Sequence, residues 1–172
     1  MQPSVYASSL AELAAQCPPP HPLWVVDLPR QRLLRQDADG RLLALPISSS
    51  RSGLGNQPDS GCTPLGWHRV VARIGTGLPA AQAFRSRRPV SPDAAGSDPI
   101  LGRILWLKGC VPGLNRHTQA RYIYLHGTPE EDRLGTPASC GCIRVAGEAL
   151  AVWSDALTGP LPRVWIGSLP RP

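Results

Sequence analysis

Proline and glycine interrupt this chain so often that long helices are disfavoured. Twenty prolines and seventeen glycines are spread over 172 residues, and both residue types break helices and favour turns. Hydrophobic residues still make up 42% of the chain, which is enough for one buried core. We therefore expect a single, mainly β domain in which short strands alternate with turns and long loops.

Several segments have the apolar runs or the alternation of strands. Residues 24–26 and 42–45 flank the turn signal Asp37–Gly40 and predict a β-hairpin. In the stretch 121–127, Tyr122, Tyr124 and His126 are expected to share one face of a strand. Further strands are predicted at residues 67–74, 100–109 and 162–167.

Two short helices and two long loops complete the prediction. The first helix runs from Ser8 or Ser9 to about Gln16, and the second lies between Val145 and Gly159, which is expected to cap it. Residues 1–22 are expected to form an N-terminal tail, and residues 23–172 the single domain. The loops cover residues 48–66 and 76–99, and the second is expected to contain a helical turn at 80–84 and to cover a cleft.

The net charge of +6 comes almost entirely from arginine, since Lys108 is the only lysine. The only tight basic cluster is Arg85, Arg87 and Arg88, without the interleaved aromatic residues of a nucleic-acid patch. We therefore expect no nucleic-acid partner, and an anionic polymer or a carboxylate-bearing substrate fits better. The chain lacks a run of about 18 apolar residues, so no membrane span is predicted. No secretory signal is visible at the start of the chain. We expect a monomer.

Five cysteines form an odd set without the regular spacing of a disulfide framework. A zinc site would need a second Cys or His half-site, which the sequence does not supply, so no metal is predicted. No glycine-rich phosphate loop is present either, and no cofactor is predicted.

The segment "LHGTPEEDRLGTPASCGCIRV" gathers the residues with the greatest chemical potential. Cys142 follows Gly141, precedes Arg144 and stands just before the second predicted helix, a setting that can favour a thiolate. The backbone N–H groups of Gly141 and Cys142 can point at a developing oxyanion, and His126 is a candidate base. Taken singly, however, such a cysteine is more often a small buried residue and such a histidine a structural one.

The same segment resembles the His-Gly-Thr, Leu-Gly and Ser-His-Gly-Cys-Ile-Arg signature of the L,D-transpeptidase catalytic domain of the YkuD type. Further agreement lies in "SSRSGLGNQPDSGCTPLGWHRV" and "GPLPRVWIG", so the resemblance covers roughly residues 23–167. It implies a β-rich domain, sandwich-like or barrel-like, with one short helix after the catalytic motif. The implied substrate is the peptidoglycan stem peptide, which a cysteine attacks to form a thioester that passes to an amine or to water.

The resemblance also implies roles for individual residues. Cys142 takes the position of the nucleophile, and His126, Ser139 and Gly141 match the other catalytic positions. Arg144 matches an arginine credited with holding a substrate carboxylate. Further substrate contacts are expected from Tyr124, Gly127 and Thr128.

Cys140 stands where the family usually has a histidine. Because a histidine beside the nucleophile is a natural general base, three alternatives stay open. His126 can serve as the base, Arg144 and local dipoles can hold enough thiolate, or the domain binds stem peptides without turnover. Cys140 is expected to be a small filler rather than a redox partner, and His68 and His117 are outside candidates for the base.

The expected function is therefore that of a cysteine L,D-transpeptidase that cross-links or trims the cell wall, with possible L,D-carboxypeptidase activity and sensitivity to carbapenems. The alternatives are an impaired domain that only binds stem peptides, and another Cys-His acyltransferase such as a sortase-like enzyme, although the Thr-Leu-x-Thr-Cys segment of sortases is absent. The implied substrate places the protein in the periplasm or cell envelope.

Overall fold

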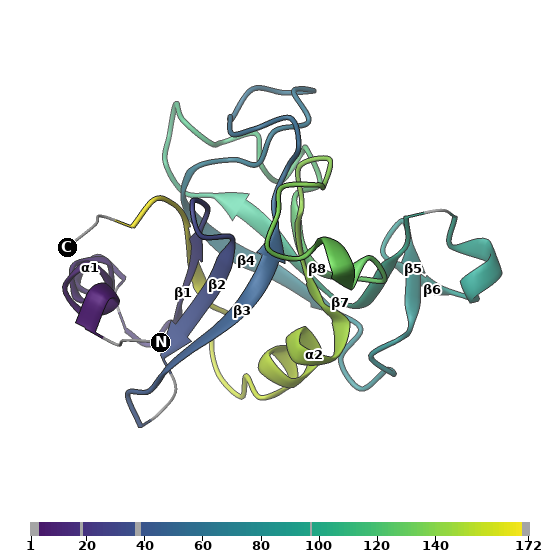
Figure 1. Cartoon of the computed structure of the whole chain (residues 1–172), viewed down its shortest axis with the longest axis horizontal. Helices are drawn as coiled ribbons and strands as arrows, with labels where there is room; N and C mark the ends of the chain where they lie inside the picture. Colours follow the sequence, from purple (N-terminus) through teal and green to yellow (C-terminus); the bar gives the residue numbers. More distant parts are fainter. Residues whose placement is uncertain (1–3, 18, 37–38, 97, 170–172) are drawn as a thin grey trace.

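The fold is a closed barrel of eight strands, seen in a computed structural model that describes residues 4–17, 19–36, 39–96 and 98–169. The strands follow the order β4-β10-β1-β2-β3-β9-β8-β7, and β7 pairs again with β4 to close the ring (Figure 1). The β5–β6 hairpin extends outward from β7. The mainly β prediction is confirmed, in its barrel form.

The elements in chain order are α1 (Ser4–Ala15), β1 (Leu23–Asp27), β2 (Arg32–Gln36), β3 (Leu42–Ser48), β4 (Gly66–Ile74), β5 (Ala83–Arg85), β6 (Arg88–Val90), a 3₁₀ turn (Pro92–Ala94), β7 (Ile100–Gly109), β8 (Tyr124–Thr128), a second 3₁₀ turn (Glu131–Arg133), β9 (Ile143–Ala146), α2 (Gly147–Asp155) and β10 (Arg163–Gly167).

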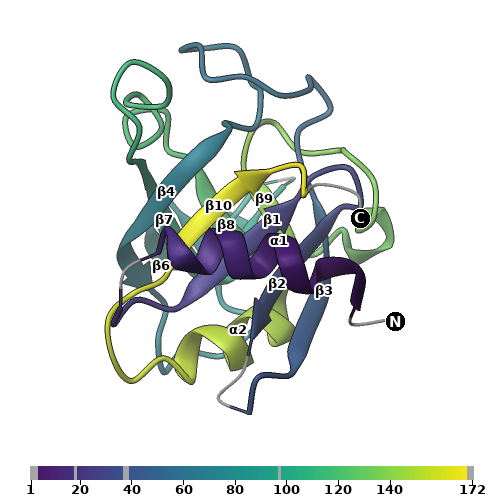
Figure 2. The same ribbon diagram turned by 90° about the vertical axis from the view of Figure 1, so that its left-hand side faces the viewer.

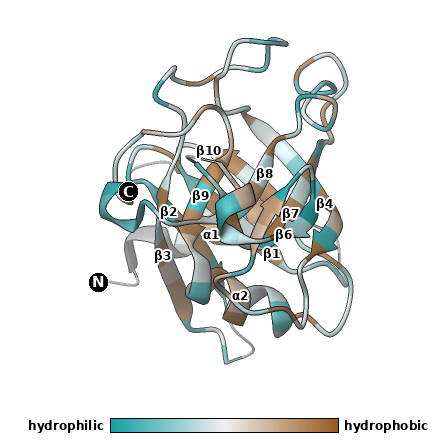
Figure 3. Cartoon of the chain, turned by 90° about the vertical axis from the view of Figure 1, so that its right-hand side faces the viewer, coloured by the Kyte–Doolittle hydropathy of each residue, from teal (hydrophilic) through white to brown (hydrophobic). Residues whose placement is uncertain are grey.

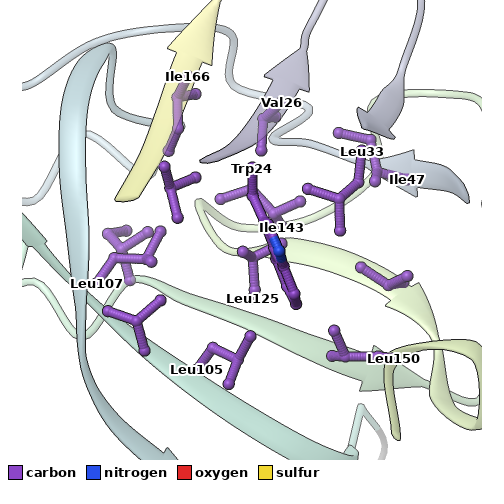
Figure 4. Close-up of a cluster of buried hydrophobic side chains, with 14 of the residues drawn as sticks. Trp24, Val26, Leu33, Ile47, Leu105, Leu107, Leu125, Ile143, Leu150 and Ile166 are labelled. Atoms are coloured by element: carbon purple, nitrogen blue, oxygen red, sulfur yellow. The ribbon is translucent and has the colours of Figure 1, made fainter. Parts of the chain in front are cut away.

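The inside of the barrel is filled by inward-facing aliphatic side chains around Trp24. Figure 4 shows Trp24 among its neighbours, which include Leu125 from β8 and Ile143 from β9. Helix α2 adds Leu150 and Trp153 to this cluster, and the Trp153 ring meets Trp24 edge-on at 5.7 Å between centroids. Because these side chains are almost fully buried, they supply the main hydrophobic stabilisation of the fold.

Helix α1 packs on the outer surface of the barrel. Leu10 and Leu13 contact Val25 of β1 and Leu34 of β2 in a second cluster, and Figure 2 shows the helix lying across these strands. The helix begins four residues before the predicted Ser8 and ends at Ala15. The predicted N-terminal tail is thus packed against the domain through its helix.

Two predictions in the loops and hairpins were wrong. The region 24–45 contains an additional strand, β2, because the chain also turns at residues 28–31, where Gln31 has a φ of 48° without being glycine. Of the predicted turn signal Asp37–Gly40, Asp37 and Ala38 lie outside the described residues. Of the helical turn expected at 80–84, residues 80 and 81 form a single turn closed by the Gln82 N–H and the Pro79 carbonyl, and residues 83 and 84 belong to β5. The two-residue turn after β5 has positive φ at Ser86 and Arg87, positions where glycine or asparagine is the usual signal.

Two element ends also differ from the prediction. Strand β8 begins at Tyr124, because Tyr122 adopts a φ of 55° in the preceding turn. Helix α2 ends at Asp155, four residues before the predicted glycine cap. Arg73 explains this early end, since its guanidinium donates to the carbonyls of Ser154 and Leu157 at 2.6 and 3.0 Å and satisfies groups that a longer helix would bond internally.

Substitution of Gly127 tests how closely β8 packs against its neighbours. A methyl group on Gly127 would lie 2.6 Å from the Leu101 carbonyl oxygen and 2.8 Å from the Gly147 Cα. We expect Gly127→Ala to lower the free energy of unfolding by about 2–3 kcal/mol, because backbone atoms must move. Urea unfolding measures this, and Gly159→Ala, whose methyl would meet nothing within 4 Å, is the matched control. Equal stability of the two variants would contradict the packing.

Candidate active site

The candidate residues gather on the outer face of β8 and β9. These two strands are parallel, and His126 pairs with Arg144 in their register. Side chains alternate along a strand, so Tyr124 and His126 share one face of β8. Cys142 directly precedes β9, where its sulfur contacts the backbone of Tyr122 and Tyr124, and Arg144 lies on β9 opposite His126. The intervening Leu125 and Ile143 point into the barrel core. One register therefore brings together four of the residues that the sequence singled out.

The sulfur of Cys142 is held by the backbone of the neighbouring segment. The Tyr124 N–H donates to Sγ at 3.4 Å, and the thiol donates to the Tyr122 carbonyl at 3.5 Å. Burial raises the pKa of the Cys142 thiol to about 11, although the Tyr124 N–H and the charge of Arg144 act in the opposite direction. The Cys142 thiol is accordingly protonated at neutral pH.

His126 is buried and neutral. Its Nδ1 lies 2.8 Å from the Gly127 carbonyl oxygen, and because a carbonyl only accepts, Nδ1 carries the proton and Nε2 has the free lone pair. Burial lowers the pKa of His126 to about 4, and the positive charge of Arg144 acts in the same direction. The imidazole is thus in the form that can take up a proton, on the strand next to Cys142.

Ser139 and Gly141 shape the segment that leads into the nucleophile. The Ser139 hydroxyl donates to the Cys142 carbonyl at 2.6 Å and accepts from the Gly141 N–H at 3.2 Å. Gly141 has a φ of 126°, a conformation that favours glycine, and its carbonyl accepts from the Thr63 hydroxyl at 3.0 Å. The Gly141 N–H is therefore engaged within the loop in this state rather than free for an oxyanion.

The loop 48–66 supports this segment from the other side. Backbone hydrogen bonds join Ser139 to Ser49 and Arg51, at 2.9 and 3.0 Å. The guanidinium of Arg121 holds the loop itself, since it donates to the carbonyls of Gly55 and Cys62 at 3.1 and 2.5 Å. Arg121 was not identified from the sequence, because its partners are backbone atoms about 60 residues away.

Arg144 is buried between two carboxylates of the chain. Its guanidinium pairs with Glu130 at 2.6 Å and also with Asp98, and only 5% of its side chain is exposed. Neither acidic residue was singled out in the sequence. Glu130 lies within the quoted segment 125–145 but matches none of its motif positions, and Asp98 comes from the loop 76–99. A substrate carboxylate would have to displace one of them, so the carboxylate-binding role of Arg144 stays a prediction.

The remaining predicted substrate contacts lie at different depths. Tyr124 is buried beside the nucleophile, whereas Gly127 and Thr128 are buried further along β8. The Thr128 hydroxyl accepts from the Glu130 N–H at 3.2 Å. Thr128 also lines a cavity of about 740 Å³ that continues past Ala146 to the start of α2. This cavity lies beyond Arg144 on the strand and not at the sulfur of Cys142.

The other cysteines and histidines do not contact the Cys142 sulfur. Cys140 is exposed, and all five cysteines are free thiols. His68 is fully buried, with Nδ1 2.9 Å from the Gly66 carbonyl and Nε2 3.2 Å from the Thr118 hydroxyl. His117 accepts from the Arg116 guanidinium at 2.9 Å. Of the histidines considered in the sequence, His126 is the one on the face of the nucleophile.

Neither a metal cluster nor a membrane helix is found in the described part of the chain. Residues 4–17, 19–36, 39–96 and 98–169 contain no group of three His, Cys, Asp or Glu side chains placed to hold an ion. Within the same ranges, no helix is both long and apolar enough to cross a membrane.

Known proteins share this architecture. Residues 22–166 match the L,D-transpeptidase catalytic domain, YkuD. The L,D-transpeptidase from Mycobacterium smegmatis superposes with a TM-score of 0.53 at 16% identity, over 86% of this chain and 59% of that chain. An L,D-transpeptidase solved in complex with imipenem superposes with a TM-score of 0.51 at 18% identity, over 85% of this chain and 58% of that chain.

A third structure, the L,D-transpeptidase from Xylanimonas cellulosilytica, gives a TM-score of 0.50 at 21% identity, over 93% of this chain and 69% of that chain. At such identities the likeness is one of fold. The chain spans about three fifths of the length of the first two structures. No curated protein matches the sequence.

Acidification should destabilise the fold through its buried histidines. Burial lowers the pKa of both His68 and His126 from 6.5 to about 4. The contribution of these two neutral histidines to the free energy of unfolding is fully present above pH 6.5. It is lost as the pH falls towards 4, because the unfolded chain then binds protons that the folded chain excludes. Each histidine accounts for roughly 3 kcal/mol.

The measurement is urea unfolding at several pH values between 7 and 4, with His68→Gln compared with the unchanged protein. The variant should lose clearly less stability over this range, since one of the two buried histidines is gone. His117→Gln removes a histidine from a surface turn and serves as the control. Identical pH slopes for His68→Gln and the unchanged protein would contradict the assignment.

The raised pKa of Cys142 predicts slow alkylation at neutral pH. With a pKa of about 11 instead of 9.0, the thiolate fraction at pH 7 is about a hundredfold below that of an ordinary thiol. The rate with iodoacetamide should rise about tenfold per pH unit between pH 7 and 10. Peptide mapping in a Cys140→Ala background measures the alkylation of Cys142 alone. An alkylation rate that is constant below pH 8 would contradict the raised pKa and would indicate a thiolate paired with an imidazolium.

Proposed function

Because the chain belongs to the YkuD family of L,D-transpeptidase catalytic domains, we propose that it transfers acyl groups of peptidoglycan stem peptides through a thioester on Cys142. The observation that carries the proposal is the position of Cys142, which directly precedes β9 and whose sulfur contacts the Tyr124 N–H, beside the face of β8 that also bears His126. The fold alone would not carry it, since one fold can host several activities.

The first half of the reaction follows from the two neutral groups. As the Cys142 sulfur attacks the substrate carbonyl, its proton passes to Nε2 of His126, so that no free thiolate is needed in the resting state. The carbonyl oxygen becomes an oxyanion, which backbone N–H groups near Cys142 can stabilise. The intermediate then collapses, the amide C–N bond breaks, and the leaving amine takes the proton back from His126.

The second half releases the acyl group. An acceptor amine or a water molecule attacks the thioester carbonyl and gives a proton to His126. The C–S bond breaks, and the proton returns to the Cys142 sulfur. An amine gives a cross-link, and water gives a trimmed stem, so transpeptidase and L,D-carboxypeptidase activities differ only in the acceptor. Since peptidoglycan lies outside the cytoplasmic membrane, we place the reaction in the periplasm or cell envelope.

Other residues of the site act through position. Ser139 and Gly141 fix the path of the chain into Cys142. Arg144 joins the segments that carry Asp98 and Glu130 beside the reacting face, and it reaches a substrate only when one carboxylate moves away. Cys140 is exposed, so it does not fill internal space as a small filler would, and it has no role in the proposed reaction.

A domain that binds stem peptides without turnover is the main rival. It is favoured by the protonated thiol of Cys142. Acylation separates the two functions, because only a working nucleophile becomes covalently modified. A sortase-like enzyme is separated by substrate, since it would act on protein sorting peptides and not on sacculi.

Incubation with a carbapenem should give one covalent adduct on Cys142, detected by mass spectrometry of the intact protein and of its peptides. Cys142→Ala should give no adduct, whereas Cys140→Ala should retain it. His126→Gln should slow acylation by roughly 10²- to 10⁴-fold, the usual contribution of a positioned base. Product analysis of treated muropeptides then distinguishes cross-linking from trimming.

The result that would overturn the enzyme is a protein that stays unmodified on prolonged incubation while its far-ultraviolet circular dichroism shows a folded β domain. Acylation of Cys140 in place of Cys142 would reject the assigned nucleophile. An unchanged acylation rate in His126→Gln would reject the assigned base.

A further inference from the structure

Arg87, at the tip of the β5–β6 hairpin, lies near the segment that contains Cys142. Ala83 and Phe84 of β5 pair with Leu101 and Ile100 of β7, which anchors the hairpin at the start of that strand. Figure 3 looks onto this side of the molecule. The tip residue Arg87 lies over Trp106, further along β7. The hairpin therefore reaches the same outer face that bears Tyr124 and Cys142.

The guanidinium of Arg87 rests on an aromatic platform. Its central carbon lies 4.7 Å from the ring centroid of Trp106 and 5.1 Å from that of Tyr122. The two rings are stacked, with centroids 5.8 Å apart and planes inclined by 22°. One guanidinium nitrogen donates to the Tyr124 hydroxyl at 3.1 Å. These contacts fix the position of the charge before any ligand arrives.

Most of the donors of Arg87 remain available. An arginine has five N–H groups, and the contact with Tyr124 uses one of them. In residues 4–17, 19–36, 39–96 and 98–169, no carboxylate lies within ion-pair distance of Arg87. Arg144, by contrast, is already held by Asp98 and Glu130. Arg87 is thus the arginine of this face that can accept a new carboxylate without losing one.

The platform is also joined to the nucleophile. The Tyr122 carbonyl accepts the Cys142 thiol, and the Tyr124 N–H donates to the same sulfur. The hydroxyl end of Tyr124 meets Arg87 and its backbone N–H meets the sulfur, so the guanidinium and the sulfur contact opposite ends of one tyrosine, and we take its length as the scale of their separation. This separation is too long for a carboxylate directly beside the attacked carbonyl, and it suits one at the end of an extended side chain.

We propose that Arg87, together with Trp106 and Tyr122, forms a subsite for a substrate carboxylate that lies about one tyrosine side chain from the carbonyl attacked by Cys142. The proposal rests on the proposed function, because it names how the same site recognises its substrate. The ligand class is a peptide with a diamino-acid side chain that ends in a free carboxylate. Arginine suits this role because its planar donors match both carboxylate oxygens.

The test measures binding without chemistry, in a Cys142→Ala background. Two stem tetrapeptides are titrated by calorimetry, identical except that the carboxylate at the end of the diamino-acid side chain is free in one and a carboxamide in the other. The free carboxylate should bind about tenfold more tightly than the amide. Arg87→Gln should abolish this preference, and Arg87→Lys should keep part of it.

Arg88→Gln is the matched control, since it removes the same charge from an exposed neighbour on the same hairpin that makes no contact with the platform. The tenfold preference should survive in this variant. The proposal is overturned if Arg87→Gln keeps the preference, if it weakens both peptides equally, if Arg88→Gln abolishes the preference as well, or if neither peptide binds.

These outcomes are separate from those of the proposed function. Carbapenem acylation tests the reactivity of Cys142 and is measured in the protein that retains this residue. The binding test uses the Cys142→Ala variant. Acylation without a preference for the carboxylate would reject only the Arg87 subsite. A preference without acylation would keep the subsite and reject the enzyme.

Discussion

The parallel pairing of β8 with β9 is the constraint on which the site depends. Leu125 and Ile143 face each other in this register and are both fully buried in the barrel. A shift by one residue would turn these side chains outward and bury His126 and Arg144 in an apolar core, at the cost of an uncompensated charge. The hydrophobic core thus fixes the register, and the register in turn places the reactive side chains together.

The same burial sets the protonation states on the outer face. Desolvation penalises the charged form of each group, so it raises the pKa of Cys142 and lowers the pKa of His126. Both effects favour the neutral pair over a thiolate facing an imidazolium. The Cys142 thiol is thereby protected from reagents that need a free thiolate.

Much of this arrangement could be predicted from local pattern. The alternation around His126 identified the face that Tyr124 and His126 share, because this signal lies within a few residues of the chain. The expectation that the Gly141 N–H points at an oxyanion is not met in this state, since that N–H donates to the Ser139 hydroxyl. The hairpin that carries Arg87 was missed, since its turn has positive φ at residues without the usual turn signature. The pairing of Asp98 with Arg144 joins positions 46 residues apart, and nothing in the periodicity of either segment records such a contact.

The two arginines of this face show why a matching motif position does not settle a role. A guanidinium as buried as that of Arg144 must be paired within the protein, because an unpaired buried charge would destabilise the fold. Its two carboxylates are therefore a requirement of its depth, and they leave it little capacity for a ligand. Arg87 is half-buried on aromatic rings, where a cation needs no ionic partner. Because Arg87 does not need a carboxylate of the protein as a partner, Arg87 rather than Arg144 is ready to recognise an anion.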